Sequence, residues 1–146
     1  MIVPRERLAE AEAIAAAAAA AHKLGDPFDP ATQQGPLVSA DQRERVRDYI
    51  RRGIQEGARL ITGGAEPPAG LDLGYFVAPT VFSDERSEMT ISQEEIFGPV
   101  LSNIPCDEEE DAVRIANASL RAVGCAVVGR RGACTEGRAQ DPHRSG

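Results

Sequence analysis

The amino-acid sequence predicts an α/β fold, because segments with helical and with strand patterns alternate along its 146 residues. Helical patterns cover residues 5–23, 39–57 and 107–117, and short apolar runs lie between and after them. Strings rich in Gly and Pro separate these segments, as is typical of turns. The length suits a single domain, and no internal repeat is visible.

The first helix is expected over residues 5–23, since this segment is rich in Ala and Glu, which favour helices. Pro4 precedes it, where proline is tolerated, and Gly25 follows it as a stop signal. Residues 26–36 then contain several Pro-bearing turn strings. We therefore expect a loop between the first and the second helix.

The second helix is expected to begin after Ser39, which has the side chain of an N-cap, with Gln42 three residues later in a capping-box pattern. It should run to about Gly57. Its expected apolar face consists of Val46, Tyr49, Ile50 and Ile54. A short strand over residues 59–62 follows, and residues 63–64 close it as a Gly-Gly turn.

The remaining pattern predicts strands and one more helix. Residues 75–83 form an apolar run around Pro79, and the proline confines this run to an edge strand or a bend. Residues 100–106 predict a strand, and residues 107–117 predict a helix whose acidic first turn suits the helix dipole. Residues 124–128 predict a final strand.

The charge excludes several classes of partner. The formal net charge is −7 and the sequence pI is about 4.9, so we expect neither nucleic acid nor an anionic membrane surface as a partner. No segment has the roughly 20 consecutive strongly apolar residues of a membrane-spanning helix. The widely spaced cysteines Cys106, Cys125 and Cys134 suggest free thiols in a reducing compartment, so we expect a cytoplasmic protein.

The most informative string runs from residue 93 to residue 100, where two carboxylates precede an aromatic ring and a Gly-Pro turn. A carboxylate such as Glu95 can accept hydrogen bonds from a ribose diol, and the face of Phe97 can lie against a planar heterocycle. The alternative is purely structural: Glu95 is solvated and Phe97 fills the core.

Seven strings, in one order, resemble the aldehyde dehydrogenase superfamily over about residues 2–128. They are residues 25–29, 34–37 with Gln42, 56–58, 63–64, 74–81, 94–100 and 116–119. Several motifs in a fixed order are far more specific than any one of them. The resemblance implies an α/β architecture, as a partial catalytic domain with alternating helices and strands.

The resemblance also implies a reaction and a cofactor. In this family an aldehyde is oxidised to a carboxylic acid through a cysteine thiohemiacetal, hydride passes to NAD or NADP, and the resulting thioester is hydrolysed. Glu95 matches the glutamate that binds the nicotinamide-side ribose, and Phe97 matches the aromatic residue at the nicotinamide end. Gln42 aligns with a helix residue near the cofactor, and Arg45 stands where the family often has Lys.

By the same resemblance, the nucleophilic Cys would lie upstream of Met1. We therefore expect residues 1–128 to be a truncated part of a catalytic domain, inactive alone, that binds NAD or NADP weakly or not at all. An aldehyde substrate and association into a homo-oligomer, or with another chain of the family, are implied. The alternative is a non-catalytic interaction or complementation partner, or a decayed relic. Residues 129–146 form a polar, Arg-rich tail without the resemblance, which we expect to be disordered.

No residue of this chain is expected to be catalytic or to bind a metal ion. Five acidic residues follow Cys106 directly, and neighbouring carboxylates raise the pKa of a thiol. Cys125 lies in an apolar run that would keep it neutral, and Cys134 lies in the tail. His22 and His143 are far apart in the sequence and have no cluster of further ligands. The acidic run itself is expected to be a solvated first helical turn rather than a cation site.

Overall fold

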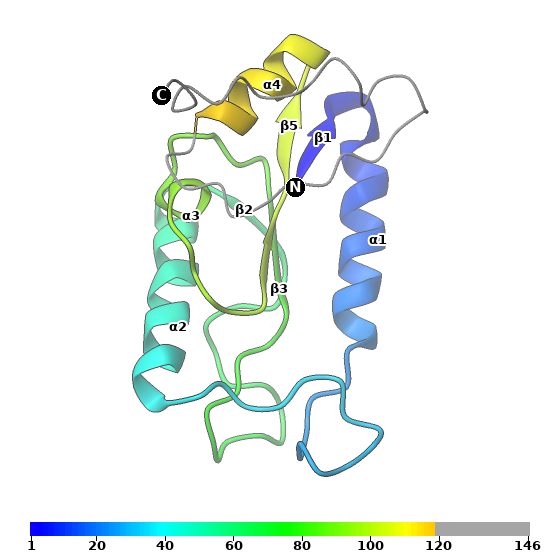
Figure 1. The fold of residues 1–146 in the computed structure, drawn as a ribbon. Coiled ribbons are helices and arrows are strands. Elements are labelled where there is room, and N and C mark those ends of the chain that lie inside the picture. Colours follow the sequence, from blue (N-terminus) through cyan, green and yellow to red (C-terminus); the bar gives the residue numbers. More distant parts are fainter. Residues whose placement is uncertain (119–146) are drawn as a thin grey trace, which may run out of the picture.

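The computed structural model describes residues 1–118, in which helices and strands alternate. In chain order the elements are β1 (Ile2–Pro4), a short 3₁₀ helix η1 (Arg5–Arg7), α1 (Leu8–Ala21), α2 (Ala40–Gln55), β2 (Arg59–Thr62), β3 (Thr80–Ser83), α3 (Thr90–Gln93), β4 (Val100–Ser102), β5 (Ile104–Cys106) and α4 (Glu109–Asn117). The long helices α1 and α2 flank the strands on opposite sides, and α4 lies beside the β1–β5 pair (Figure 1).

The described strands form two small sheets. In the first, the order is β2-β3-β4, with β2 antiparallel and β4 parallel to β3. In the second, β1 pairs with β5 in parallel, so that Ile2 lies opposite Ile104. The start of the chain is thereby joined to a segment about a hundred residues later.

The continuous strand that we predicted over residues 100–106 is interrupted at Asn103. Before this residue the chain pairs with β3, and after it the chain pairs with β1. The amide of Asn103 donates to the carbonyl of Phe82 at 3.0 Å, and the amide of Ile104 donates to the carbonyl of Met1 at 2.9 Å. Asn103 is fully buried. It is therefore the point at which the chain passes from one sheet to the other.

Of the two alternatives predicted for the run around Pro79, an edge strand or a bend, the edge strand is wrong. The strand begins only at Thr80, after the proline, and β3 lies between its two partners. Proline lacks a ladder donor, but Pro79 lies outside the ladder and therefore leaves a central strand possible. The four residues of β3 are all buried, so this strand is the centre of the sheet rather than its rim.

The predicted helices are confirmed, with small differences at their ends. The first begins with η1, and the second ends at Gln55 rather than near Gly57. The Ser39 hydroxyl accepts a hydrogen bond from the amide of Gln42 at 3.1 Å, so Ser39 is the N-cap of α2. The second half of the capping box is wrong, because the Gln42 side chain bonds to a different segment, described below.

The main core lies between α2 and the sheet that contains β3. Its buried members are Val46, Ile50, Ala58, Val77, Phe82, Met89, Ile91 and Ile96. Val46 and Ile50 of the predicted helix face are fully buried, and Tyr49 is half-buried. Ile54 is 46% exposed, so the apolar face of α2 ends one turn earlier than its sequence suggested.

On the other side of the sheet, Glu12 ties α1 to the strands. Its carboxylate accepts a hydrogen bond from the Ser83 hydroxyl at 2.6 Å and from the Arg59 guanidinium at 2.5 Å. None of the helices within residues 1–118 is long and apolar enough to cross a membrane. The strand predicted over residues 124–128 and the tail predicted over residues 129–146 lie outside the described residues.

Candidate functional site

The candidate site is a turn over residues 94–99 that lies against the first half of α2. Ile96 is buried in the core, and its neighbours Glu95 and Phe97 are exposed. Phe97 is 66% exposed, so the alternative in which this ring fills the core is wrong, and Ile96 fills it instead. Phe97 also has a φ of 54°, in the left-handed region that costs a residue other than glycine about 1–2 kcal/mol. Other contacts must hold the turn in this conformation.

Gln42 supplies the first of these contacts. Its side-chain amide nitrogen donates to the carbonyl of Phe97 at 2.8 Å and to the carbonyl of Ile96 at 3.2 Å. One helix side chain therefore bonds both peptide units that flank the left-handed residue. Because Ser39 fixes the start of α2 and Gln42 lies in its first turn, the helix end and the turn are mutually positioned.

Gly98 supplies the second contact, through the absence of a side chain. A Cβ atom at this position would lie 2.6 Å from Cγ2 and 2.7 Å from Cγ1 of Val46, which is itself fully buried. The turn can approach α2 this closely only with glycine at position 98. Just beyond it, the amide of Val100 donates to the carbonyl of Gly98 at 2.8 Å, where β4 begins.

The third contact involves Arg45 and Tyr49, one and two turns further along the same face of α2. The Arg45 guanidinium donates to the carbonyl of Glu95 at 3.2 Å and lies 5.5 Å from the centre of the Tyr49 ring. The Tyr49 hydroxyl donates to the carboxylate of Glu94 at 2.5 Å. Arg45 therefore holds the main chain of the turn, and Tyr49 holds one of its two acidic side chains.

The two carboxylates of the turn differ in their partners among residues 1–118: that of Glu94 is hydrogen-bonded, and that of Glu95 is not. The hydrogen bond to the Glu94 carboxylate raises the pKa of Tyr49, and burial and the negative charge of Glu94 act in the same direction. The nearby charge of Arg45 opposes this rise. The Glu95 carboxylate makes no hydrogen bond or ion pair with any residue in the described part of the chain. It is exposed and available to a ligand.

The structure thus brings together Gln42, Glu95 and Phe97, the three residues that the sequence predicted as cofactor-binding. Their role toward a cofactor stays a prediction. Tyr49 is a polar contact that its sequence position did not indicate, because its spacing placed it on the apolar face of α2. A signal was present in the Arg45–Tyr49 spacing of four residues, which puts both side chains on the same side of a helix.

Cys106 does not have the properties of a nucleophile. It is a free thiol at the end of β5 and is 6% exposed. Burial is the main cause that raises the pKa of this thiol, and the charges of Asp111 and Asp107 raise it further. The sequence predicted the effect of the carboxylates but not the larger effect of burial. Cys125 and Cys134 lie outside the described residues.

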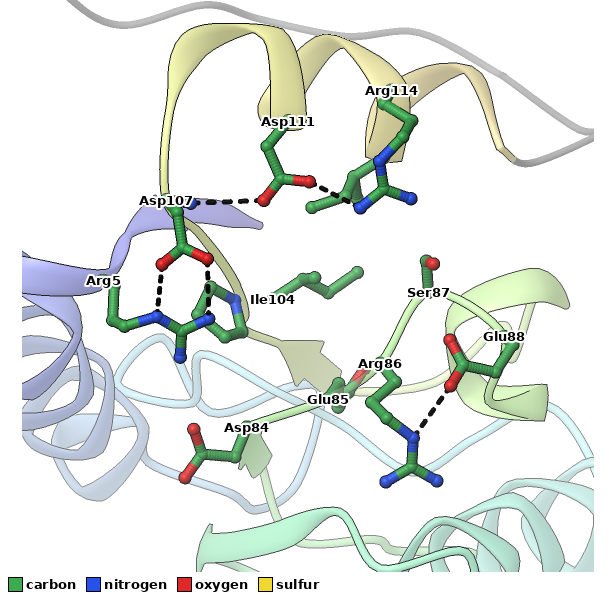
Figure 2. A pocket seen from close by; sticks show the side chains of 12 residues that line it. Arg5, Asp84, Glu85, Arg86, Ser87, Glu88, Ile104, Asp107, Asp111 and Arg114 are labelled. Carbon is green, nitrogen blue, oxygen red and sulfur yellow. Dashed lines mark hydrogen bonds and ion pairs between the residues drawn. The ribbon is translucent and has the colours of Figure 1, made fainter.

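A hollow of about 430 Å³ lies apart from this turn, between α4, η1 and the segment after β3 (Figure 2). Its charged side chains are largely paired with one another. The pairs are Arg5–Asp107 at 2.5 Å, Arg114–Asp111 at 2.5 Å and Arg86–Glu88 at 2.8 Å. Glu109, Glu110 and Asp111 lie in the first turn of α4, and Asp107 pairs with Arg5. Residues 1–118 contain no group of three potential metal ligands.

Comparisons with known proteins agree with the motif order found in the sequence. A family model described as "Aldehyde dehydrogenase family" matches residues 1–140. The 3-succinoylsemialdehyde-pyridine dehydrogenase of a Pseudomonas species is 47% identical over 119 residues, which are 82% of this chain and 25% of that protein. The betaine aldehyde dehydrogenase of Brucella ovis is 51% identical over 98 residues, 66% of this chain and 20% of that protein.

Solved structures give the same result. The aldehyde dehydrogenase C of Pseudomonas syringae, in complex with NAD⁺ and octanal, aligns with a TM-score of 0.80 at 48% identity, over 82% of this chain and 24% of that one. A Mycobacterium tuberculosis aldehyde dehydrogenase in complex with NAD⁺ aligns with a TM-score of 0.77 at 54% identity, over 81% and 24%. The chain spans a quarter or less of the length of these relatives.

Proposed function

Because the chain belongs to the aldehyde dehydrogenase family, we propose that it contributes the nicotinamide end of the cofactor site to the NAD(P)-dependent oxidation of an aldehyde to a carboxylic acid. Family membership confirms the resemblance read from the sequence, and the solved relatives confirm the α/β class. The reaction, the substrate class and the cofactor-binding residues are the proposal.

The observation that carries the proposal is the geometry of the 94–99 turn. Glu95 presents a carboxylate without a partner among the described residues, and Phe97 presents an exposed ring two residues later. A carboxylate can accept two hydrogen bonds from a ribose diol, and a ring face can lie against the nicotinamide. Gln42 holds the carbonyls on both sides of Phe97, so the ring is presented on a fixed backbone. Two solved relatives were crystallised with NAD⁺, which favours this cofactor for the present chain.

The thiol that attacks the aldehyde is proposed to come from outside residues 1–118. Cys106 is buried, and its raised pKa leaves little thiolate at neutral pH. By the family resemblance the attacking thiol belongs to a segment other than these 146 residues, so we expect the 146-residue chain by itself to form no NADH from aldehydes, even where it binds the cofactor. Aldehyde-dependent absorbance at 340 nm from the pure chain would overturn this expectation.

Cofactor binding is tested by titrating NAD⁺ and NADP⁺ separately into the 146-residue chain, with ligand-observed NMR as the readout. Glu95→Gln should weaken NAD⁺ binding by about tenfold or more, the effect of losing a hydrogen bond to a charged group. Glu110→Gln is the matched control, since it removes the same charge from an exposed position on α4. Equal NAD⁺ affinity of the two variants would overturn the assignment of Glu95.

A second candidate function, association without catalysis, is favoured by apolar side chains on the surface. The exposed ones include Ile14, Phe28, Val38 and Leu73. The β1–β5 sheet has only two parallel strands within residues 1–118, whereas parallel sheets normally have both faces covered and more strands. Such a surface suits another copy of the chain or a separate polypeptide of the same family. A monomer by light scattering, with one sharp thermal transition, would argue against association.

We also propose a cytoplasmic location. The support is Cys106, which the structure describes as a free thiol, and free thiols are typical of reducing compartments. Fractionation of cells that express the chain tests this proposal, and recovery in an oxidising compartment would overturn it.

A further inference from the structure

We propose that Tyr49 is a positioning residue of the cofactor site: it binds the carboxylate of Glu94 and thereby leaves Glu95 alone to receive the ribose. The inference rests on the proposed function, because it concerns the same turn. It gives Glu94, to which the sequence assigned no role, a task different from that of Glu95.

The backbone of the turn separates the two side chains. Glu94 follows α3 with φ −117° and ψ 148°, an extended conformation. In an extended chain successive side chains point to opposite sides. When the Glu94 carboxylate faces α2, the side chain of Glu95 is therefore directed away from the helix.

Tyr49 fixes which of the two side chains faces the helix. Its hydroxyl donates to Oε2 of Glu94 at 2.5 Å, across 45 residues of sequence. The ring is half-buried on α2, with the Arg45 guanidinium 5.5 Å from its centre. Arg45 donates to the carbonyl of Glu95 at 3.2 Å, so adjacent turns of α2 hold both the backbone and the Glu94 side chain. Among the described residues, the Tyr49 hydroxyl makes no hydrogen bond to Gln42, Glu95 or Phe97, the residues assigned to the ligand.

Loss of the Tyr49 hydroxyl would free the Glu94 carboxylate beside that of Glu95. Two neighbouring carboxylates without partners repel each other, and either could then turn toward the ribose. The turn would also lose a contact that fixes the end of α3 on α2. Both effects weaken cofactor binding without removing any group that touches the cofactor.

The Tyr49–Glu94 bond can be tested spectroscopically, because the chain contains two Tyr and no Trp. Tyr75→Phe leaves Tyr49 as the sole tyrosine, and its ionisation is then followed by ultraviolet absorbance, with circular dichroism monitoring the fold. Tyr49 should titrate above the ordinary tyrosine pKa, and Glu94→Gln should lower its pKa toward that value. Glu95→Gln is the matched control and should leave the Tyr49 pKa unchanged. An unchanged Tyr49 pKa in Glu94→Gln would overturn the proposal.

NAD⁺ titrations separate the positioning role from the proposed function. Tyr49→Phe should weaken NAD⁺ binding several-fold, whereas Tyr75→Phe, the same substitution at the other tyrosine, should leave it unchanged. If Glu95→Gln weakens binding and Tyr49→Phe does not, the positioning role is overturned while the proposed function stands. If neither Glu95→Gln nor Tyr49→Phe weakens NAD⁺ binding, the assignment of Glu95 to the cofactor fails and the role of Tyr49 fails with it.

Discussion

Replacement of Gly98 by Ala tests whether the close contact between the turn and α2 holds the candidate site in place. The added Cβ would lie 2.6 Å from Cγ2 of Val46, which is 0.8 Å short of the 3.4 Å at which ordinary contact begins. Val46 is fully buried, so it cannot move into solvent to relieve the clash. Overpacking of this kind costs about 1–3 kcal/mol, and we expect Gly98→Ala to lower the free energy of unfolding by that amount.

The control is Val46→Ala, which removes both Cγ atoms that would clash. Alone, this variant should cost about 2 kcal/mol through lost burial and the cavity it leaves. In its background the nearest remaining atom is the Cβ of residue 46, which lies 3.3 Å from the added methyl. The double variant should therefore be more stable than the sum of the single effects predicts, by about 1–2 kcal/mol.

Urea unfolding of the four chains, followed by far-UV circular dichroism, measures these differences. The slope of the unfolding free energy against urea should be the same in each, since the folded and unfolded surfaces are alike. A Gly98→Ala variant as stable as the wild type would refute the reasoning. So would an equal cost of Gly98→Ala in the wild-type and Val46→Ala backgrounds, because the contact with the Val46 side chain would then not be its cause.

Three further predictions concern single side chains. Burial raises the pKa of Glu85, so the folded chain holds the proton of this carboxyl more tightly than the unfolded chain does, and the free energy of unfolding falls as pH rises above about 4.5. Glu85→Gln should make the free energy of unfolding depend less on pH, and this variant should unfold at a higher urea concentration than the wild type at pH 7. Ser39→Ala should cost about 1 kcal/mol in urea unfolding, because it removes the N-cap acceptor of α2, and an unchanged midpoint would contradict this. In a chain with Cys125 and Cys134 replaced by Ala, Cys106 should react slowly with a disulfide reagent at pH 7.5 and rapidly in concentrated urea; equal rates would show that it is not buried.

Local signals allowed the helices to be predicted and left the strand pairing undetermined. Ser39 and the apolar spacing after it specify α2, because an N-cap and a helical period act within a few residues. The break at Asn103 could not be predicted, since residues 100–106 form one continuous strand-like run in the sequence. What divides the run is the choice of two partners, β3 and β1, that are distant in the chain. Pairing of this kind depends on the assembled fold rather than on the residues of the strand.

In the candidate site, too, some features could be predicted from the sequence, and others depend on contacts between distant segments. Family resemblance selected Gln42, Glu95 and Phe97, and the structure places them in one turn and on one helix. The hydrogen bond from Tyr49 to Glu94 spans 45 residues, and the spacing of Arg45 and Tyr49 on α2 does not indicate Glu94 as the partner. The sequence left two alternatives for Phe97, core or surface. Ile96, one residue away, decides between them by occupying the core.

The pairing of β1 with β5 has a consequence for the order in which the chain folds. Ile2 and Ile104 meet only after about a hundred intervening residues have been brought into place, and each strand has just three residues. Contacts that close a long loop cost much conformational entropy, and when they contribute little stabilising free energy they form late in folding and open early in unfolding. The sheet around β3 and the turn held by α2 should therefore become structured first, and the β1–β5 pair should form last. In hydrogen exchange the amide of Ile104 should lose its protection before that of Asn103, although the two are adjacent. The amide of Ile104 donates to Met1, beside β1, whereas the amide of Asn103 donates to Phe82 of β3.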